Sequence, residues 1–156
     1  MNDAWPAAGR LAGIDFGTVR IGIAVTDAGR LLASPYENYT RRSPELDARY
    51  FRELADQEAI QGFVVGLPIH ASGQESEKSR QARQFGDWLQ AVTGRPVRFF
   101  DERYTTAHAR QLLGDTPLSG KKRRQRLDML AAQILLASFL EASPDAQPAP
   151  LDDQSA

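Results

Sequence analysis

Three acidic positions in this chain lie where a carboxylate is locally out of place. Asp15 lies within an apolar stretch typical of a β-strand, where an uncompensated charge is unfavourable. Asp101 and Glu102 directly follow another apolar stretch, and Asp128 precedes a helical segment that is nearly all apolar. An acid in such a place needs a partner for its charge. For Asp15 the two common partners are a bound cation and a ring of backbone amides around a phosphate.

Strand-like and helical segments alternate along the chain in an order that can bring these acids together. Residues 11–27 predict two strands joined by a tight turn, and residues 31–39 predict a third, so a meander opens the chain. Two short apolar runs, at 60–67 and 97–100, predict buried strands. Strands that alternate with helices after a meander favour an α/β fold with a mixed sheet and helices on its faces.

Four helices are expected between and after these strands. Ser43 followed by Pro44 is a typical helix start, and the apolar spacing in residues 75–92 is helical. A short helix is expected from Thr105 or Thr106 to Leu113. We expect residues 114–126 to form a loop and Asp128 to open the last helix, which is apolar almost all round and therefore buried.

The carboxyl ends of parallel strands are where ligands bind in open sheets, and the acids are expected to converge there. Carboxylates brought together repel one another unless a divalent cation neutralises them. With no cysteine and two histidines in the chain, oxygen ligands favour Mg²⁺ or Mn²⁺ over zinc. Each acid also has an ordinary structural explanation: turn amides for Asp15, a strand end for Asp101 and Glu102, and a helix N-terminus for Asp128.

Charge is distributed unevenly along the 156 residues. The last sixteen contain four acids and neither lysine nor arginine; the rest of the chain has 19 basic and 16 acidic residues, a formal charge of +3. Much of the positive charge lies in one run: Lys121, Lys122, Arg123, Arg124 and Arg126. Such a run is either a solvated segment or a contact for a polyanion. No signal peptide or membrane-spanning segment is recognisable, which favours a cytoplasmic protein.

The chain resembles the YqgF/RuvX family in four segments taken in series: GIDFGTVRIGIAVTD, VVGLPIHASGQESEKSRQARQF, DERYTT and DMLAAQILLASFLE. The resemblance covers residues 10–141 and leaves out a leader (1–9) and an acidic tail (142–156), both expected to be flexible. It implies an RNase H-like fold, with a mixed five-stranded sheet whose first three strands are antiparallel, flanked by helices. That fold agrees with the order of elements expected from the residues alone.

The resemblance also implies a site and a reaction. The catalytic, metal-binding acids would be Asp15, the Asp101-Glu102 pair and Asp128; adjacent strand residues face opposite sides, so which of the pair faces the site stays open. The implied reaction is two-metal hydrolysis of phosphodiesters, in processing of the 5′ end of pre-16S rRNA during ribosome biogenesis. Substrate contacts are expected from Arg20, Arg103 and the basic run, with Gly17 and Gly73 allowing close approach of the backbone.

Three alternatives stay open at this point. One is a Holliday junction resolvase-like nuclease acting on branched or single-stranded DNA, which would be expected to work as a homodimer. Another is a non-catalytic factor that binds nucleic acid. Ribosomal particles would be further partners of this factor and of the pre-rRNA nuclease alike. The third, a phosphate-binding loop of an actin-like ATPase at residues 15–18, is disfavoured because such enzymes need two domains of this kind.

Overall fold

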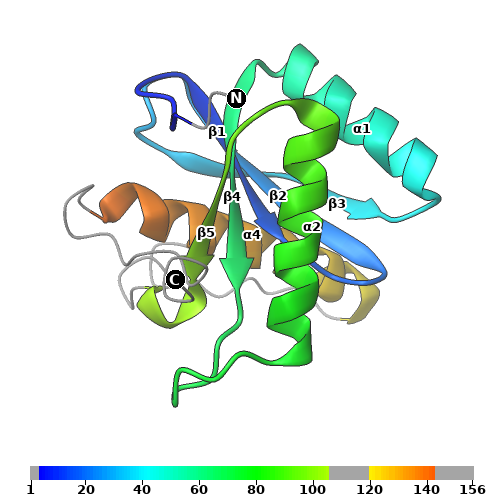
Figure 1. The fold of residues 1–156 in the computed structure, drawn as a ribbon, viewed down its shortest axis with the longest axis vertical. Helices are drawn as coiled ribbons and strands as arrows, with labels where there is room; N and C mark the ends of the chain where they lie inside the picture. Colours follow the sequence, from blue (N-terminus) through cyan, green and yellow to red (C-terminus); the bar gives the residue numbers. More distant parts are fainter. Residues whose placement is uncertain (1–3, 106–119, 143–156) are drawn as a thin grey trace.

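Five strands form one mixed sheet in the order β3-β2-β1-β4-β5 (Figure 1). The computed structural model describes residues 4–105 and 120–142. β1, β2 and β3 pair antiparallel, whereas β4 is parallel to β1 and β5 is parallel to β4. The α/β fold with a mixed five-stranded sheet is therefore confirmed. The strands are β1 Arg10–Asp15, β2 Arg20–Thr26, β3 Ala33–Thr40, β4 Ile60–Leu67 and β5 Val97–Asp101.

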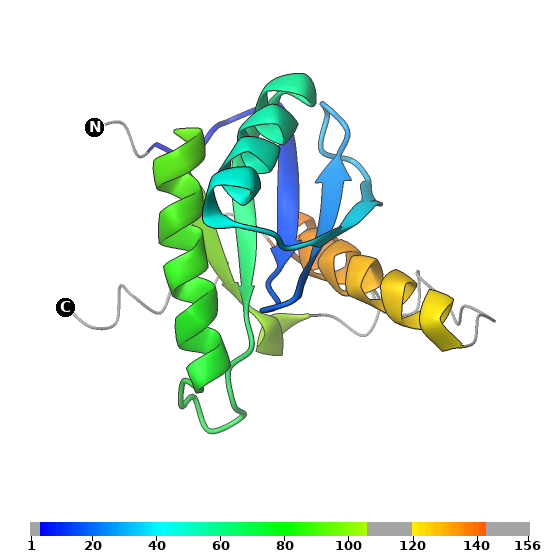
Figure 2. The same cartoon turned by 90° about the vertical axis from the view of Figure 1, so that its right-hand side faces the viewer.

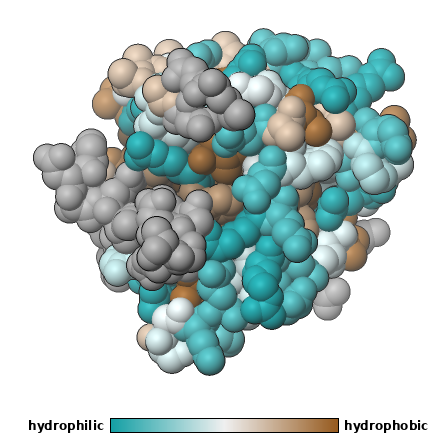
Figure 3. Space-filling view, in the orientation of Figure 1, coloured by the Kyte–Doolittle hydropathy of each residue, from teal (hydrophilic) through white to brown (hydrophobic). Residues whose placement is uncertain are grey.

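Helices cover both faces of this sheet (Figure 2). α1 (Pro44–Gln57) and α2 (Glu77–Thr93) lie on one face, and α4 (Gly120–Glu141) crosses the other. As expected, the Ser43 side chain caps α1 by accepting a hydrogen bond from the Leu46 amide. A short 3₁₀ turn, η1 (Glu102–Tyr104), follows β5. The outward face of α2 is mainly hydrophilic (Figure 3), as expected for a surface helix.

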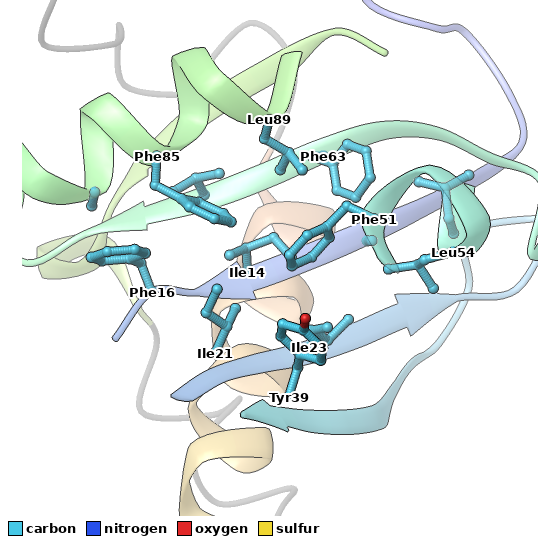
Figure 4. Close-up of a cluster of buried hydrophobic side chains, with 14 of the residues drawn as sticks. Ile14, Phe16, Ile21, Ile23, Tyr39, Phe51, Leu54, Phe63, Phe85 and Leu89 are labelled. Carbon is cyan, nitrogen blue, oxygen red and sulfur yellow. The ribbon is translucent and has the colours of Figure 1, made fainter. Parts of the chain in front are cut away.

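Each helical layer packs on its own apolar core. The core under α1 and α2 is centred on the fully buried Phe51 and Phe63, with Phe16 and Phe85 at one end of it (Figure 4). The core under α4 contains Leu11, Val64, Phe100 and Leu136, among others. Because successive strand residues face opposite sides of a sheet, membership of these two cores shows which way each neighbouring side chain points.

The prediction for the start of the last helix was wrong. Residues 120–126, which include the basic run, were expected in a loop, yet the helix begins at Gly120. Asp128 consequently lies inside α4, more than two turns from its start, so the helix N-terminus cannot explain an acid there. Lysine, arginine and glutamine have high helix propensity, and the charged run extends the apolar helix backwards.

The described part of the expected leader contacts the body of the protein. The Trp5 ring packs edge to face on Phe139, with centroids 5.7 Å apart, and the Arg98 guanidinium lies 5.0 Å from the Trp5 ring centroid. The short helix expected after Thr105 and the tail fall outside the described residues. Within those residues, no helix is both long and apolar enough to cross a membrane.

Helix α4 approaches the sheet most closely at two glycines. A Cβ atom on Gly22 would lie 2.1 Å from the backbone oxygen of Asp128, and one on Gly13 would lie 2.9 Å from the Cβ of Leu136. Any side chain at Gly22 would therefore push the helix away from β2. The absence of a side chain at Gly22 is what allows the backbone at Asp128 to rest directly on the sheet.

Gly22→Ala should destabilise the protein by about 1–3 kcal/mol, because the new methyl group overlaps helix backbone, which cannot rotate aside. Denaturant-induced unfolding measures this change. Gly29→Ala is the matched control: its nearest neighbour, at 3.3 Å, is the end of the Asp27 side chain, so a change within about 0.5 kcal/mol is expected. Equal stability of the two variants would contradict the packing described here.

Candidate active site

The candidate site lies at one edge of the sheet, where three parallel strands end. β1 ends at Asp15, β4 at Leu67 and β5 at Asp101. In β1, Leu11 belongs to the α4 core, and a Cβ on Gly13 would point at α4. Asp15 continues this alternation and therefore lies on the α4 side of the sheet. Asp15 thus stands at the carboxyl end of β1, on the side of the sheet that α4 covers.

Glu102, rather than Asp101, shares the α4 side with Asp15. A Cβ added to Gly66 of β4 would lie 2.7 Å from Glu102 Oε2 and 3.1 Å from Leu135 of α4. The Glu102 carboxylate therefore occupies the space beside a strand that carries no side chain there. In β5 Phe100 faces α4, so its neighbour Asp101 points to the opposite side.

Asp101 is held in place by Arg103. Its carboxylate accepts hydrogen bonds from the Arg103 amide, at 2.9 Å, and from the guanidinium Nη2, at 2.6 Å. These bonds close the turn η1, and Glu102 is the first residue of that turn. In this structure Asp101 fixes the segment that carries Glu102, and Arg103, predicted to contact phosphate, is paired with Asp101 instead.

Asp128 reaches the same edge from α4. Its backbone rests on Gly22, which is the β2 partner of Asp15 in the antiparallel ladder. Asp128 Oδ2 accepts hydrogen bonds from Asn38 Nδ2 at 3.1 Å and, at the limit of bonding distance, from Arg20 Nε at 3.4 Å. Both donors bond to Oδ2 of Asp128, so Oδ1 takes part in neither of these two bonds. Asn38, on the edge strand β3, was not predicted, and no local pattern in the sequence distinguishes it.

The site is electrostatically strained. Burial raises the pKa of Asp15 to about 6, with a further upward contribution from the charge of Asp128. Burial also raises the pKa of Glu102 to about 7, and the charges of Asp15 and Asp101 add to the effect. Both carboxylates are therefore less stable as anions than ordinary acids, because they lie close together in a partly desolvated place.

Lys78 is the positive charge that opposes this strain. It lowers the pKa of both Asp15 and Glu102, and it lines a hollow of about 450 Å³ together with Arg20 and Asp128. Lys78 lies in the first turn of α2, among charged residues that look like an ordinary solvated helix start. Sequence reasoning missed it because only the fold turns this helix start toward the ends of β1 and β5.

The predicted glycines have structural reasons of their own. A Cβ on Gly17 would lie 2.3 Å from the Arg20 carbonyl oxygen, so the tight hairpin itself needs glycine there. Gly73 has a φ of +87°, in the left-handed region that glycine adopts without strain, and lies near the Arg103 guanidinium. Contacts of Gly17, Gly73 and Arg103 with a substrate stay predictions. The side chains of Lys121, Lys122, Arg123, Arg124 and Arg126 lie outside the described part of the chain.

Among the described residues, no three histidine or acidic side chains stand close enough together to hold a metal ion as they are placed. Asp15 and Glu102 nevertheless supply hard carboxylate oxygens, and burial raises the pKa of both, so a nearby positive charge would stabilise their anionic forms. Asp128 lies near enough to raise the pKa of Asp15. The donor chemistry of the acid pair fits Mg²⁺ or Mn²⁺; Asp128 could join as a third ligand only with its side chain turned away from Arg20 and Asn38.

Two solved structures with a similar fold are resolvases. Thermus thermophilus RuvC in complex with Holliday junction substrate matches with a TM-score of 0.51 over 84% of this chain and 94% of that chain, at 14% identity. Fowlpox virus resolvase with its substrate Holliday junction DNA also gives 0.51, over 85% and 97%, at 9% identity. At these identities the likeness establishes the fold alone, and the expected RNase H-like architecture is confirmed.

Sequence relatives are much closer. A protein of Rhodopirellula baltica named "Putative pre-16S rRNA nuclease" is 52% identical over 140 residues, which cover 90% of this chain and 81% of the relative. A Koribacter versatilis protein of the same name is 38% identical, with coverages of 85% and 87%. A family model described as "RuvX: Holliday junction resolvase" matches residues 9–142, nearly the whole chain. The chain therefore belongs to the RuvX family.

Proposed function

We propose that this protein is a divalent-cation-dependent nuclease that hydrolyses nucleic-acid phosphodiester bonds, in processing of the 5′ end of pre-16S rRNA. The observation that carries the chemistry is the Asp15–Glu102 pair, two partly desolvated acids at the edge where three strands end, close enough for the charge of Asp15 to raise the pKa of Glu102. The names of the relatives support the choice of substrate. On this proposal the protein acts in the cytoplasm, with precursor ribosomal particles as its partners.

Asp15 and Glu102 would hold the cation, Mg²⁺ or Mn²⁺, and Asp128 would join them. When bound, such an ion polarises a phosphoryl oxygen and lowers the pKa of a water molecule, and a second ion would stabilise the leaving oxygen. Asp101 and Arg103 act on the site through the turn: their ion pair sets where Glu102 stands. Asp101 is accordingly a positioning residue in this proposal, whereas Glu102 is a ligand.

The basic side chains would place the substrate. Arg20 and Lys78 line the hollow that adjoins Asp128, and both lie within a surface depression that a phosphate group can enter. Contacts of this kind orient a strand without reading its sequence. When a phosphate replaces Asp128 as the partner of Arg20, the Asp128 carboxylate would keep only the hydrogen bond from Asn38 and could exchange that bond for a place beside Asp15. Substrate binding and completion of the ligand set are coupled in this way.

A second candidate function is cleavage of branched DNA, which the family description "Holliday junction resolvase" favours. On this proposal the described acids and basic side chains of the site would contact the phosphate, which RNA and DNA share, so they do not separate ribose from deoxyribose. A junction-cleaving enzyme would work as a symmetric dimer that cuts two strands. The same assay, run on several substrates, separates the two functions.

Asp15→Asn and Glu102→Gln should each lower the cleavage rate at least about a hundredfold, because each removes a ligand to an ion that contributes several kcal/mol to the transition state. The measurement is cleavage of pre-16S rRNA, single-stranded RNA, single-stranded DNA and a four-way DNA junction, with Mg²⁺ or Mn²⁺ and with chelator. Asp87→Asn, on the exposed side of α2, is a matched loss of one charge and should leave the rate unchanged. Cleavage that survives both acid-to-amide changes, or persists in chelator, would refute the metal site.

The same acids should make the metal-free protein more stable at low pH. The folded state holds protons on Asp15 and Glu102 up to about pH 6 and 7, whereas the unfolded chain loses them near 3.8 and 4.5. The folded state thus binds more protons between about pH 4 and 7, so the contribution of these acids to unfolding free energy falls as pH rises through that window. Asp15→Asn should therefore stabilise the protein at pH 8 by about 1–3 kcal/mol, and have little effect at pH 3.

Asp27→Asn provides a control of opposite sign in the same unfolding experiment. Backbone amides of Leu32 and Leu31 donate to the exposed Asp27 carboxylate and lower its pKa, so this substitution should destabilise the protein at pH 8 and matter less below its folded pKa. Added Mg²⁺ should stabilise the wild-type protein at pH 8 and have a smaller effect on Asp15→Asn. A loss of stability on Asp15→Asn without cation at pH 8 would contradict the strained acid pair.

A further inference from the structure

An aromatic hollow opens beside the candidate active site, on the other side of the β1–β2 turn. Its volume is about 440 Å³, within the range of small-ligand sites. Phe16, Phe85 and Trp88 form its apolar part, and Arg41, Gln81 and Gln84 supply polar groups at its border. Neither the cation ligands nor the phosphate contacts proposed above need this hollow.

The rings of the hollow differ in exposure: Phe16 and Phe85 are buried, whereas Trp88 is partly exposed. Phe16 and Phe85 have ring centroids 5.0 Å apart and belong to the end of the α1/α2 core (Figure 4), and Phe85 and Trp88 are 5.4 Å apart. The planar guanidinium of Arg41 already lies over two of these rings, 5.3 Å from Phe16 and 5.8 Å from Phe85. A flat group that stacks on Trp88 gains ring contact, with the Arg41 cation in the lining of the same hollow.

The aromatic hollow adjoins the hollow that Arg20, Lys78 and Asp128 line. Phe16, Thr18 and Gln81 line both. Alternation at the end of β1 explains the arrangement, since Asp15 faces α4 and the next residue, Phe16, faces α2. A nucleic-acid strand that crosses the β1–β2 turn would therefore pass directly from the charged side chains of one hollow to the aromatic rings of the other.

We propose that the aromatic hollow binds the base of an unpaired nucleotide next to the phosphate that is cleaved. The occupant follows from the chemistry of the two hollows: Arg20 and Lys78 suit a phosphate, the rings suit a flat base, and the amides of Gln81 and Gln84 suit its polar edge. A base inside a duplex has both faces covered by its neighbours and cannot enter. The substrate is accordingly single-stranded, or unpaired locally, at the cleavage site. This inference rests on the proposed nuclease function.

Trp88 fluorescence tests the proposal directly. The chain has two tryptophans, so Trp5→Phe leaves Trp88 as its sole tryptophan. This protein, in chelator to prevent cleavage, is titrated with a single-stranded RNA 12-mer, the same sequence as DNA, the blunt RNA duplex, and inorganic polyphosphate. Single strands should quench Trp88, whereas polyphosphate should bind without quenching. The duplex should bind at least about tenfold more weakly than the single strand.

An abasic scan locates the base without changing the protein. Single-stranded 12-mers that lack one base each should include a position where affinity falls about 5- to 100-fold, the usual effect of losing a stacked base. Gln84→Glu adds a negative charge at the exposed border of the hollow and should weaken single-strand binding; Gln61→Glu, exposed on β4, is the matched control. Equal quenching by polyphosphate, equal affinity for duplex, or equal affinity of all abasic strands would overturn the proposal.

The outcomes separate this inference from the function on which it rests. Quenching and an abasic-sensitive position without cleavage in Mg²⁺ or Mn²⁺ would refute the nuclease and leave the base-binding hollow in place. Cleavage that proceeds equally on strands lacking any one base would refute the hollow and leave the nuclease.

Discussion

The close contact between α4 and the glycine-bearing strands is the constraint on which the site depends. At Gly22 the backbone of Asp128 meets the sheet with no room for a methyl group. Gly22 is paired with Asp15 in the ladder, so this contact also sets the distance between the two acids. Gly66 acts in the same way for Glu102, since its missing side chain leaves the space that the carboxylate fills. Two glycines, on the two strands that flank β1, thus bring three acids of distant sequence to one edge.

The acids are held together against their own repulsion. Folding places Asp15 and Glu102 in a partly buried position, which raises the pKa of each, and Lys78 offsets only part of the effect. The apolar cores on both faces of the sheet supply the stability that tolerates this arrangement. A cation bound between these acids would stabilise their anionic forms, which burial and mutual repulsion destabilise when no cation is bound. Local strain at these acids and the proposed activity are therefore two aspects of the same geometry.

The fold could be predicted from the sequence because its signals are local. Alternating apolar residues and tight turns predicted the first three strands, and Ser43-Pro44 predicted the start of α1. The apolar run at 60–67 has the same bounds as β4. The start of α4 could not be read in this way, because a charged run with high helix propensity looks the same in a loop and in a helix extension. Local sequence context singled out the acids, and the resemblance to a family implied their role; neither supplied the partners that hold them.

The parts of the site that were missed depend on packing between distant segments. Lys78 and Asn38 lie in an unremarkable helix start and an edge strand, and only the assembled sheet brings them to the acids. For the Asp101-Glu102 pair, strand alternation predicts that the two side chains face opposite sides of the sheet, but it does not say which of them faces α4. The direction follows from Phe100, whose packing on α4 turns Asp101 away.

Alternation at the end of β1 has a further consequence for how a substrate can lie. Asp15 and Phe16 are adjacent in sequence and open onto opposite sides of the sheet edge, one charged and one aromatic. The tight turn at Gly17, which leaves no space for a side chain, keeps the passage between these sides short. A polymer with an anionic backbone and flat apolar side groups matches both sides of this edge at once, whereas a free phosphate or an apolar peptide matches only one. The strand end itself, and not a separate binding domain, therefore favours nucleic acid as the ligand.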